Sequence, residues 1–322
     1  MSVPSRLRLG FLGPNATFTE QALRTLPAAA DAELVPIAGA PAVLAAVRDG
    51  SVDAGCVPIE NTVEGAVPPV LDGLVEEPRL VIAEEARVAV RFSLMGRPGT
   101  GTGDITTVAS HGHGIAQTRE WLAANLPGAE VRVTSSTAEA AAQAARGEVD
   151  AAVASPLAAQ RHGLAVLAED VADNPGAVTR FVLLTRPGPP PVPTGWDRTT
   201  LVATTPNQPG TLLGLLTELT VRGIDLTRIE SRPVKDRHAQ YWFHLDCSGH
   251  VAEPAMGEAL AALYRRCDRL IYLGSFARSD PAPGDVTPAG TGSPVVPLRT
   301  PTADDHATSE RWLDAIRRGT GT

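Results

Sequence analysis

Residues 45–58 read AAVRDGSVDAGCVP, and residues 143–156 read QAARGEVDAAVASP. Each stretch passes from a helical segment through a glycine turn into a Val-Asp-Ala strand, which leads to a polar loop after a proline. This weak internal repeat predicts two similar lobes, each with a small and mostly parallel sheet. Ligands of such sheets bind beyond the carboxyl ends of the strands, so two facing lobes predict a cleft between them.

The segments upstream of this repeat also match each other. LGFLGPNATFTEQA at residues 9–22 and TTVASHGHGIAQT at residues 106–118 both read as a strand, a glycine-containing loop and a helix start. Short β-rich runs alternate with alanine-rich helices up to residue 185, which indicates an α/β catalytic or binding domain at residues 1–185. We expect one lobe at about 1–80 with 181–185 and the other at 81–180.

The C-terminal part of the chain predicts a separate unit. Residues 186–197 contain RPGPPPVPTG, whose proline density favours a stiff interdomain linker. Residues 198–278 show a βαββαβ order, the ferredoxin-like pattern, with helices expected at 211–222 and 254–266. The tail at 279–322 is rich in Pro, Gly, Thr and Asp, which is typical of disorder, with at most a short helix near 309–318.

Composition excludes several classes of protein. The 322 residues carry a formal net charge of −8, whereas proteins that bind nucleic acids usually carry a basic surface. Cys56, Cys247 and Cys267 form no CxxC pair, which argues against disulfides or zinc and favours a reducing cytoplasm. We find no signal peptide, and no apolar run approaches the ~20 residues that a membrane span needs.

Two loops of the first lobe carry candidate binding residues. Thr17 and Glu20 have capping-box spacing, and the free N–H groups of such a helix start attract anions, although a plain helix cap reads the same way. PIENTVEG at residues 58–65 follows a strand and places Asn61 and Thr62 at the ligand-facing edge. The competing interpretation of this second segment is a solvated loop.

The equivalent loop of the second lobe is SHGHG at residues 110–114. We expect Ser110, and Gln117 one turn into the next helix, to make hydrogen bonds in the cleft. His111 and His113 lie one residue apart, but no third ligand is visible nearby, so we do not expect a metal site. SSTAEAA at residues 135–141 contains a second capping box, for which we expect mainly a structural role.

Two further segments combine groups that suit carboxylates. DNPGAVTRF at residues 173–181 brings the Thr179 hydroxyl and the Arg180 guanidinium together, and an arginine fork binds two carboxylate oxygens at once. An edge strand with an exposed arginine would read the same way. In NQPGTL at residues 207–212, Gly210 permits close approach of a carboxylate to a helix start, although simple turn chemistry also explains the glycine.

Together, five segments resemble the prephenate dehydratase family. They are GPNATFTE at 13–20, PIENTVEG at 58–65, DNPGAVTRF at 173–181, NQPGTL at 207–212 and LTRIESRP at 226–233. The resemblance implies a two-lobed catalytic domain like a periplasmic binding protein, followed by an ACT regulatory domain. Asn15-Ala16 departs from the family's glycine pattern, and SHGHGIAQ at 110–117 keeps only the two ends of its segment.

The resemblance implies a lyase of L-phenylalanine biosynthesis. It would convert prephenate to phenylpyruvate, carbon dioxide and water, with no metal or organic cofactor. By resemblance, Thr179 assists departure of the hydroxyl group and Arg180 holds the pyruvyl carboxylate. The other substrate-binding residues are expected to be Thr17, Asn61, Thr62, Ser110, Gln117 and Phe181.

The resemblance also implies feedback inhibition by L-phenylalanine, which the family's ACT domains bind between paired domains. We therefore expect a homodimer or homotetramer, and removal of everything after Pro193 should leave the dehydratase active. The implied effector-binding residues are Gly210, Thr211 and Leu212 at the turn and Glu230, Ser231, Arg232 and Pro233 on the next strand. Arogenate dehydratase and a non-catalytic amino-acid sensor are the alternatives.

Overall fold

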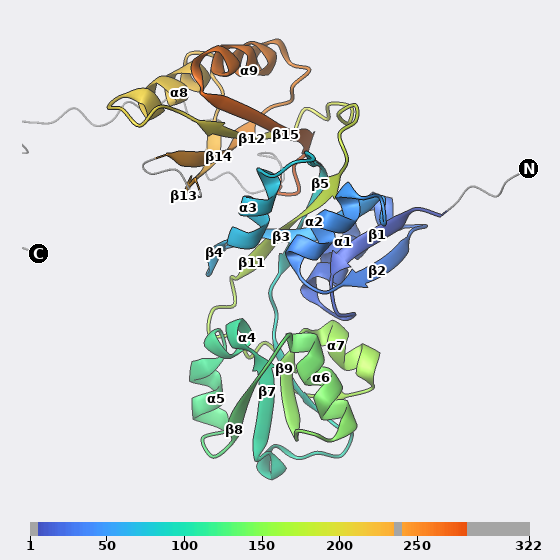
Figure 1. The fold of residues 1–322 in the computed structure, drawn as a ribbon. Coiled ribbons are helices and arrows are strands. Elements are labelled where there is room, and N and C mark those ends of the chain that lie inside the picture. The colour runs from blue at the N-terminus through green and yellow to red at the C-terminus, as the bar shows by residue number, and fades with distance from the viewer. Residues whose placement is uncertain (1–5, 235–239, 282–322) are drawn as a thin grey trace, which may run out of the picture. The chain divides into compact units, whose positions relative to one another are not determined.

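The structure, a computed structural model, describes residues 6–234 and 240–281. In this part of the chain two α/β lobes are followed by a smaller domain with one antiparallel sheet (Figure 1). None of the helices described is long and apolar enough to cross a membrane. Most of the expected tail, including the short helix near 309–318, lies outside the described residues.

The first lobe is built on a mixed sheet in the order β2-β1-β3-β11-β5. Its strands are β1 (Arg8–Leu12), β2 (Glu33–Ile37), β3 (Ala54–Asn61), β5 (Val81–Ala89) and β11 (Val178–Thr185), with β4 (Gly65–Ala66) paired to β3. β1 pairs in parallel with β2 and β3, whereas β11 is antiparallel to its neighbours β3 and β5. Helices α1 (Phe18–Thr25), α2 (Ala40–Arg48) and α3 (Pro68–Leu74) pack their buried residues against it.

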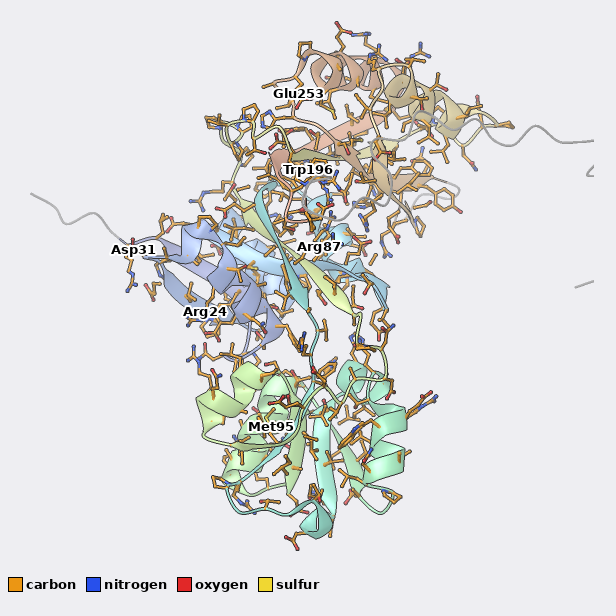
Figure 2. All side chains as sticks on the ribbon, turned by 180° about the vertical axis from the view of Figure 1, so that it is seen from behind. Arg24, Asp31, Arg87, Met95, Trp196 and Glu253 are labelled. Atoms are coloured by element: carbon orange, nitrogen blue, oxygen red, sulfur yellow. The ribbon has the colours of Figure 1, made fainter. Side chains whose placement is uncertain are left out.

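The second lobe has a five-stranded sheet in the order β10-β6-β9-β7-β8. Its strands are β6 (Ser93–Gly96), β7 (Thr107–His111), β8 (Glu130–Thr134), β9 (Ala151–Ala154) and β10 (Ala165–Ala168). Its helices are α4 (Gly112–Ala116), α5 (Arg119–Asn125), α6 (Thr137–Arg146) and α7 (Pro156–His162). Alanines dominate the core between this sheet and α6, where Met95 is fully buried (Figure 2).

The internal repeat is visible in the structure. α2 and α6 are each followed by a glycine with positive φ, 80° at Gly50 and 78° at Gly147, and then by a central strand. The repeated aspartates also act alike, since Asp53 accepts the N–H of Arg8 and Asp150 accepts the N–H of Thr107. Each aspartate therefore ties the strand it precedes to the start of the neighbouring strand.

The boundary between the lobes differs from the expected one. β5 and β11 pair with each other along their full length inside the first sheet. The first lobe therefore includes residues 81–89 and 178–180, which we had assigned to the second lobe, and the crossings are the segments around 90–92 and 172–177. The alternation of side chains along a strand does not reveal which of two sheets that strand joins.

The C-terminal domain has the expected βαββαβ order. It consists of β12 (Asp197–Thr204), α8 (Thr211–Thr220), β13 (Leu226–Pro233), β14 (Tyr241–Ser248), α9 (Pro254–Arg266) and β15 (Arg269–Ala277). The antiparallel sheet runs in the order β13-β14-β12-β15, as in ferredoxin-like folds. The two helices share one apolar core with the sheet. The fold class expected from the sequence is thus confirmed.

The C-terminal domain and the first lobe share a second apolar core. Buried side chains of β12 and β15 belong to the same cluster as side chains of α2, α3, β3 and β5; on the C-terminal side they are Val202, Ile271, Leu273 and Phe276. Gly274 has a φ of 130°, and a Cβ there would collide with the carbonyl oxygen of Ile82. Removal of the domain would expose this apolar surface, so we no longer expect the lobes alone to remain fully active.

Replacement of Phe276 tests this shared core. Phe276 is fully buried, so Phe276→Ala should lower the free energy of unfolding by about 3–5 kcal/mol, the usual cost of deleting a core aromatic ring. Urea denaturation followed by circular dichroism measures the change. Tyr264→Ala, on the exposed face of α9, is the matched control and should change stability little. An equally small effect of Phe276→Ala would show that the core is not shared.

Burial of His244 predicts a loss of stability in acid. Desolvation, with repulsion from Arg228, lowers its pKa from 6.5 to about 4. Between these values the unfolded chain binds more protons than the folded chain, so stability falls as the pH falls through this window, by up to about 3 kcal/mol. His244→Gln should flatten this part of the stability curve measured by urea denaturation. A slope identical to that of the unchanged protein would contradict the assignment.

Candidate active site

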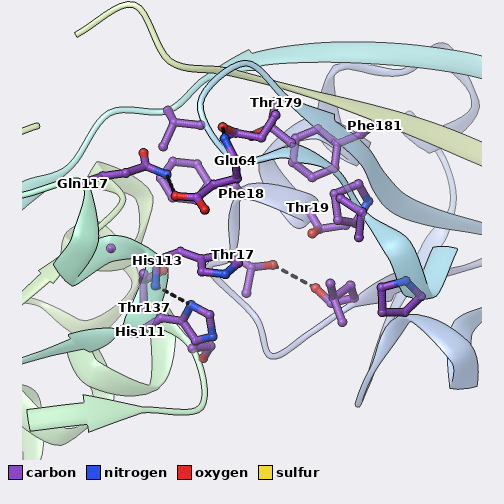
Figure 3. Close-up of a pocket in the computed structure, with 18 of the residues that line it drawn as sticks. Thr17, Phe18, Thr19, Glu64, His111, His113, Gln117, Thr137, Thr179 and Phe181 are labelled. Carbon is purple, nitrogen blue, oxygen red and sulfur yellow. Dashed lines mark hydrogen bonds between the residues drawn. The ribbon is translucent and has the colours of Figure 1, made fainter. Parts of the chain in front are cut away.

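A cavity of about 630 Å³ lies between the two lobes (Figure 3). The first lobe contributes Thr17, Phe18, Asn61, Glu64, Thr179 and Phe181 to its lining, and the second contributes Phe92, His111, His113, Gln117, Ser136 and Thr137. β1, β3 and β7 end at this cavity, because their last residues or the loops that follow them line it. The cavity thus lies at the carboxyl ends of the parallel strands, as the repeat predicts.

A hydrogen bond between Asn61 and Thr179 joins β3 to β11 inside the cavity. Asn61 Nδ2 donates to Thr179 Oγ1 at 2.8 Å, and the two residues are paired in the sheet. Asn61 Oδ1 accepts the N–H groups of Val63 and Glu64, which fixes the orientation of the amide. Because Thr179 Oγ1 accepts a hydrogen bond from Asn61, its own hydrogen is free to be donated to a ligand.

Two helix N-termini border the same cavity. Thr17 Oγ1 caps α1 by accepting the N–H of Glu20, and Ser136 Oγ caps α6 by accepting the N–H of Glu139. Residues of both starts, Thr17 to Thr19 and Ser135 to Thr137, line the cavity. Free N–H groups and the helix dipole make such ends favourable for anions. For the capping box at residues 135–141 we expected mainly a structural role, but the structure places this start of α6 at the cavity. A capping box in the sequence does not reveal what its helix faces.

Ala16 shows why the family pattern has a glycine at this position. Its φ is 69°, in the left-handed region where a side chain costs about 1–2 kcal/mol. Its N–H donates to Glu20 Oε2 at 2.6 Å, and its carbonyl accepts the hydroxyl of Ser155 from the second lobe. Burial alone would raise the pKa of Glu20, but this N–H, Arg24 and Arg161 lower it. The strained turn is therefore held by contacts between the lobes.

Gln117 and Glu64 face each other across the cavity from different lobes. Gln117 Nε2 donates to Glu64 Oε1 at 3.2 Å, while Gln117 Oε1 is buried with no partner among the described residues. A reversed amide would set this oxygen against the carboxylate of Glu64, so the orientation is the favourable one. Gln117 therefore offers an acceptor to a donor group of a ligand.

His111 and His113 contribute a neutral donor to the lining. The backbone N–H of His113 donates to His111 Nδ1 at 3.2 Å. The hydrogen of the neutral His111 ring is therefore on Nε2. Burial, with the proximity of His113, lowers the pKa of His111 below its usual range. The described residues contain no group of three or more His, Cys, Asp or Glu side chains placed to hold a metal ion.

Arg180 lies outside the cavity, and this position does not support its expected role as a ligand of the pyruvyl carboxylate. Side chains alternate along a strand, and Thr179 and Phe181 of β11 face the cavity while Arg180 faces the other side. Its side chain is 4% exposed and lies 2.6 Å from Asp246 and 3.5 Å from Glu85. A fork already held by these buried carboxylates is not available to a substrate in the cleft.

Thr62 and Ser110 also lie outside the residues that line the cavity. Thr62 Oγ1 accepts the N–H of Val178 at 2.9 Å, so it joins the loop after β3 to the start of β11. Ser110 is almost fully buried, and its hydroxyl donates to the carbonyl of Val153 on the adjacent strand. Both hydroxyls make hydrogen bonds within the protein, while the cavity brings together Thr17, Asn61, Gln117, Thr179 and Phe181.

The cavity lining has no arginine or lysine among its described residues. Any carboxylate bound there must therefore interact with the helix starts, with neutral side chains such as His111 and with the hydroxyls. Sequence reasoning overlooked this arrangement because it sought a cation. The singled-out SHGHG segment did contain a usable signal, since His111 ends β7 at the ligand-facing edge.

The expected effector segments lie in the C-terminal domain. Gly210 has a φ of 87° and precedes α8, and Thr211 Oγ1 donates to the carbonyl of Pro206 at 2.8 Å. β13 is an edge strand, and its residues alternate, with Ser231 and Pro233 exposed. Arg232 Nε donates to Asp72 Oδ1 of α3 at 2.8 Å, so this side chain contacts the first lobe.

A family model, a curated relative and a solved structure point to the same family. A family model described as prephenate dehydratase matches residues 9–189. A prephenate dehydratase of Mycobacterium bovis is 47% identical over 97% of this chain and 95% of its own length. The crystal structure of prephenate dehydratase from Arthrobacter aurescens in complex with L-Phe is 40% identical, with a TM-score of 0.80 over 97% of this chain and all of that one.

One similar structure carries a different description. It is named GqqA, a novel type of quorum quenching acylase, and it is 30% identical with a TM-score of 0.76. It covers 84% of this chain and is itself covered to 98%. The shared architecture therefore occurs in a protein with another described activity.

Proposed function

The chain belongs to the prephenate dehydratase family, and we propose that it converts prephenate to phenylpyruvate, carbon dioxide and water in the cleft between its lobes. The observation that carries this proposal is the hydroxyl of Thr179, held by Asn61 with its hydrogen free toward the cavity. Prephenate must lose a ring carboxylate and a ring hydroxyl together. The hydroxyl leaves more easily when a donor hydrogen-bonds to it.

Recognition of the two carboxylates falls to the starts of α1 and α6 and to the Nε2–H of His111. These groups line the cavity from both lobes, so a dianion can bridge them. Phe181, Phe18 and Phe92 supply apolar surface for the ring, and the rings of Phe18 and Phe92 meet edge to face at 5.5 Å. Gln117 Oε1 is the acceptor available to the substrate's hydroxyl before it leaves.

The arrangement favours elimination over acyl transfer. A hydroxyl nucleophile needs an adjacent base that takes its proton, but the partner of Thr179 is the Nδ2 donor of Asn61, an amide that cannot act as that base. Thr179 is therefore suited to donate a hydrogen bond and not to attack an acyl group. An assay for acylase activity, with turnover of prephenate and arogenate compared in parallel, separates the three possible activities.

We further propose that L-phenylalanine, the end product, inhibits the enzyme through the C-terminal domain. The relative from Arthrobacter aurescens was solved with L-Phe, and the turn at Gly210 and the exposed edge strand β13 suit a site formed between paired domains. The functional form is then a homodimer or homotetramer. The three cysteines are free, which fits a cytoplasmic location.

Replacement of Thr179 tests the catalytic proposal. Thr179→Val keeps the shape of the side chain and removes the hydroxyl, so kcat for prephenate should fall by at least ~100-fold with KM little changed. Thr185→Val, at the other end of β11, is the matched control and should retain normal kinetics. A Thr179→Val variant with near-normal kcat would refute the role of the hydroxyl.

Replacement of Gly210 tests the effector proposal. Gly210→Val should abolish binding of phenylalanine in titration calorimetry and its inhibition of turnover, because the turn must admit the amino acid's charged end. Gly223→Val is the matched control, since Gly223 follows α8 with a φ of 69° and carries a similar backbone strain. If the unchanged protein binds no phenylalanine at millimolar concentration, regulation fails as a proposal while the catalytic one stands.

A further inference from the structure

The two residues of the catalytic hydrogen bond each have a charged neighbour on the opposite face of the sheet. Asn61 follows Glu60 on β3, and Thr179 precedes Arg180 on β11. Glu60 and Arg180 are register partners, as are Asn61 and Thr179. Because strand side chains alternate, whatever holds Glu60 and Arg180 also constrains where Asn61 and Thr179 stand.

Arg180 is held by a carboxylate of the C-terminal domain. Arg180 Nη2 lies 2.6 Å from Asp246 Oδ2 of β14, and neither side chain is appreciably exposed. Asp246 is fixed in turn by the hydroxyl of Thr200 on β12, which donates to Oδ1 at 2.7 Å. Burial disfavours the charged guanidinium, but attraction to Asp246 and Glu85 outweighs it and raises the pKa of Arg180.

Glu85 adds a second carboxylate to this cluster from β5. It lies 3.5 Å from Arg180 Nη1 and 3.0 Å from Arg198 Nη1 of β12, and it accepts the N–H of Ser279. Burial raises the pKa of Glu85 despite the attraction to Arg180. The C-terminal domain therefore contributes partners to both carboxylates that hold Arg180.

Glu60 is likewise held by the C-terminal domain. Arg228 of β13 places Nε 3.5 Å from Glu60 Oε1, and Arg180 places Nε 3.7 Å from Glu60 Oε2. Arg228 is 10% exposed and Glu60 is 38% exposed, so solvent screens this attraction more than that between Arg180 and Asp246. β13 also carries the proposed effector residues Glu230 to Pro233, only two positions further along the same strand.

The backbone pairing of β11 with β3 is irregular next to Glu60 and Arg180. The pairing of β11 with β3 shifts register between Arg180 and Phe181, immediately after the pair formed with Glu60. At such an irregularity the regular ladder does not fix the strands against each other. The ion pairs beside it therefore help to set the separation of Asn61 and Thr179.

We propose that the C-terminal domain sets the geometry of the Asn61–Thr179 hydrogen bond through two ion pairs, Arg228–Glu60 and Asp246–Arg180. Glu60 and Arg180 are positioning residues that never meet the substrate. A displacement of β13 or β14 on effector binding loosens these pairs and misplaces the Thr179 hydroxyl, which lowers kcat. This inference rests on the proposed dehydratase function and supplies a route for its regulation.

The first test is a double-mutant cycle on Glu60 and Arg228 in the full chain. Glu60→Gln and Arg228→Gln should each lower kcat for prephenate by about 2- to 30-fold, the range for mutations that act through coupling networks, with KM nearly unchanged. Both changes break the same pair, and Glu60→Gln also removes the contact with Arg180, so the double variant should lose about as much as Glu60→Gln alone instead of the product of both losses. Inhibition by phenylalanine should weaken in all three variants.

The second test changes Thr200 of the C-terminal domain, whose hydroxyl donates to Asp246. Thr200→Val removes the hydroxyl that fixes Asp246 and should also lower kcat with little change in KM. Thr199→Val is the matched control on the same strand, since its hydroxyl contacts Ser275 and Gly249 instead, and it should leave kcat normal. Arg269→Gln removes another ion pair to the first lobe, with Glu77, and should likewise be neutral.

Circular dichroism must show that each variant is folded before its kinetics are compared. Normal kcat in Glu60→Gln and Arg228→Gln, losses that multiply in the double variant, or effects confined to KM would each overturn the inference. Equal losses in Thr199→Val and Thr200→Val would overturn it too, because a general destabilisation would explain both. Failure of the unchanged protein to turn over prephenate would refute the proposed function instead. An assay of the unchanged protein alone gives that result.

Discussion

Side chains along β11 point alternately to the two faces of the sheet, and this alternation connects the cleft with the C-terminal domain. Thr179 and Phe181 face the cavity, while Arg180 between them faces Asp246 and Glu85 on the opposite side. The three side chains are attached to one short stretch of backbone, so a shift of that backbone moves all of them. β11 is an interior strand of the first sheet and therefore faces the cavity on one side and the C-terminal domain on the other.

The buried charges make this constraint strong. An isolated guanidinium in an apolar interior is very unfavourable, and removal of one partner from a buried ion pair typically costs about 3–5 kcal/mol. Arg180 has its carboxylates from two domains, and a common apolar core joins those domains beside it. The C-terminal domain is thus part of the folded catalytic unit and not an independent attachment behind a linker.

The lack of an arginine or lysine among the described residues that line the cleft suits the proposed reaction. The carboxylate that leaves as carbon dioxide loses its charge as the bond breaks. An arginine paired with it would stabilise the ground state more than the transition state and would slow the step. Helix N-termini and neutral donors bind a dianion less tightly than an arginine does, but they stabilise the ground state less. Their attraction for the dianion is stronger in a cavity that is partly closed from water.

The sequence alone determined the lobes, the ferredoxin-like domain and most of the cleft. The repeat around Asp53 and Asp150 reflects local geometry, because in both lobes a glycine with positive φ follows the helix and the aspartate ties the next strand to its neighbour. The motifs with Asn61 and Thr179 lie at strand ends, where topology brings ligand-binding groups together. Only the tertiary structure decided that β5 belongs to the first sheet and that Arg180, Thr62 and Ser110 turn away from the cavity. The direction of a side chain depends on the register of its strand and on the partners across the sheet, and for Arg180 the partner is an aspartate 66 positions later in the chain.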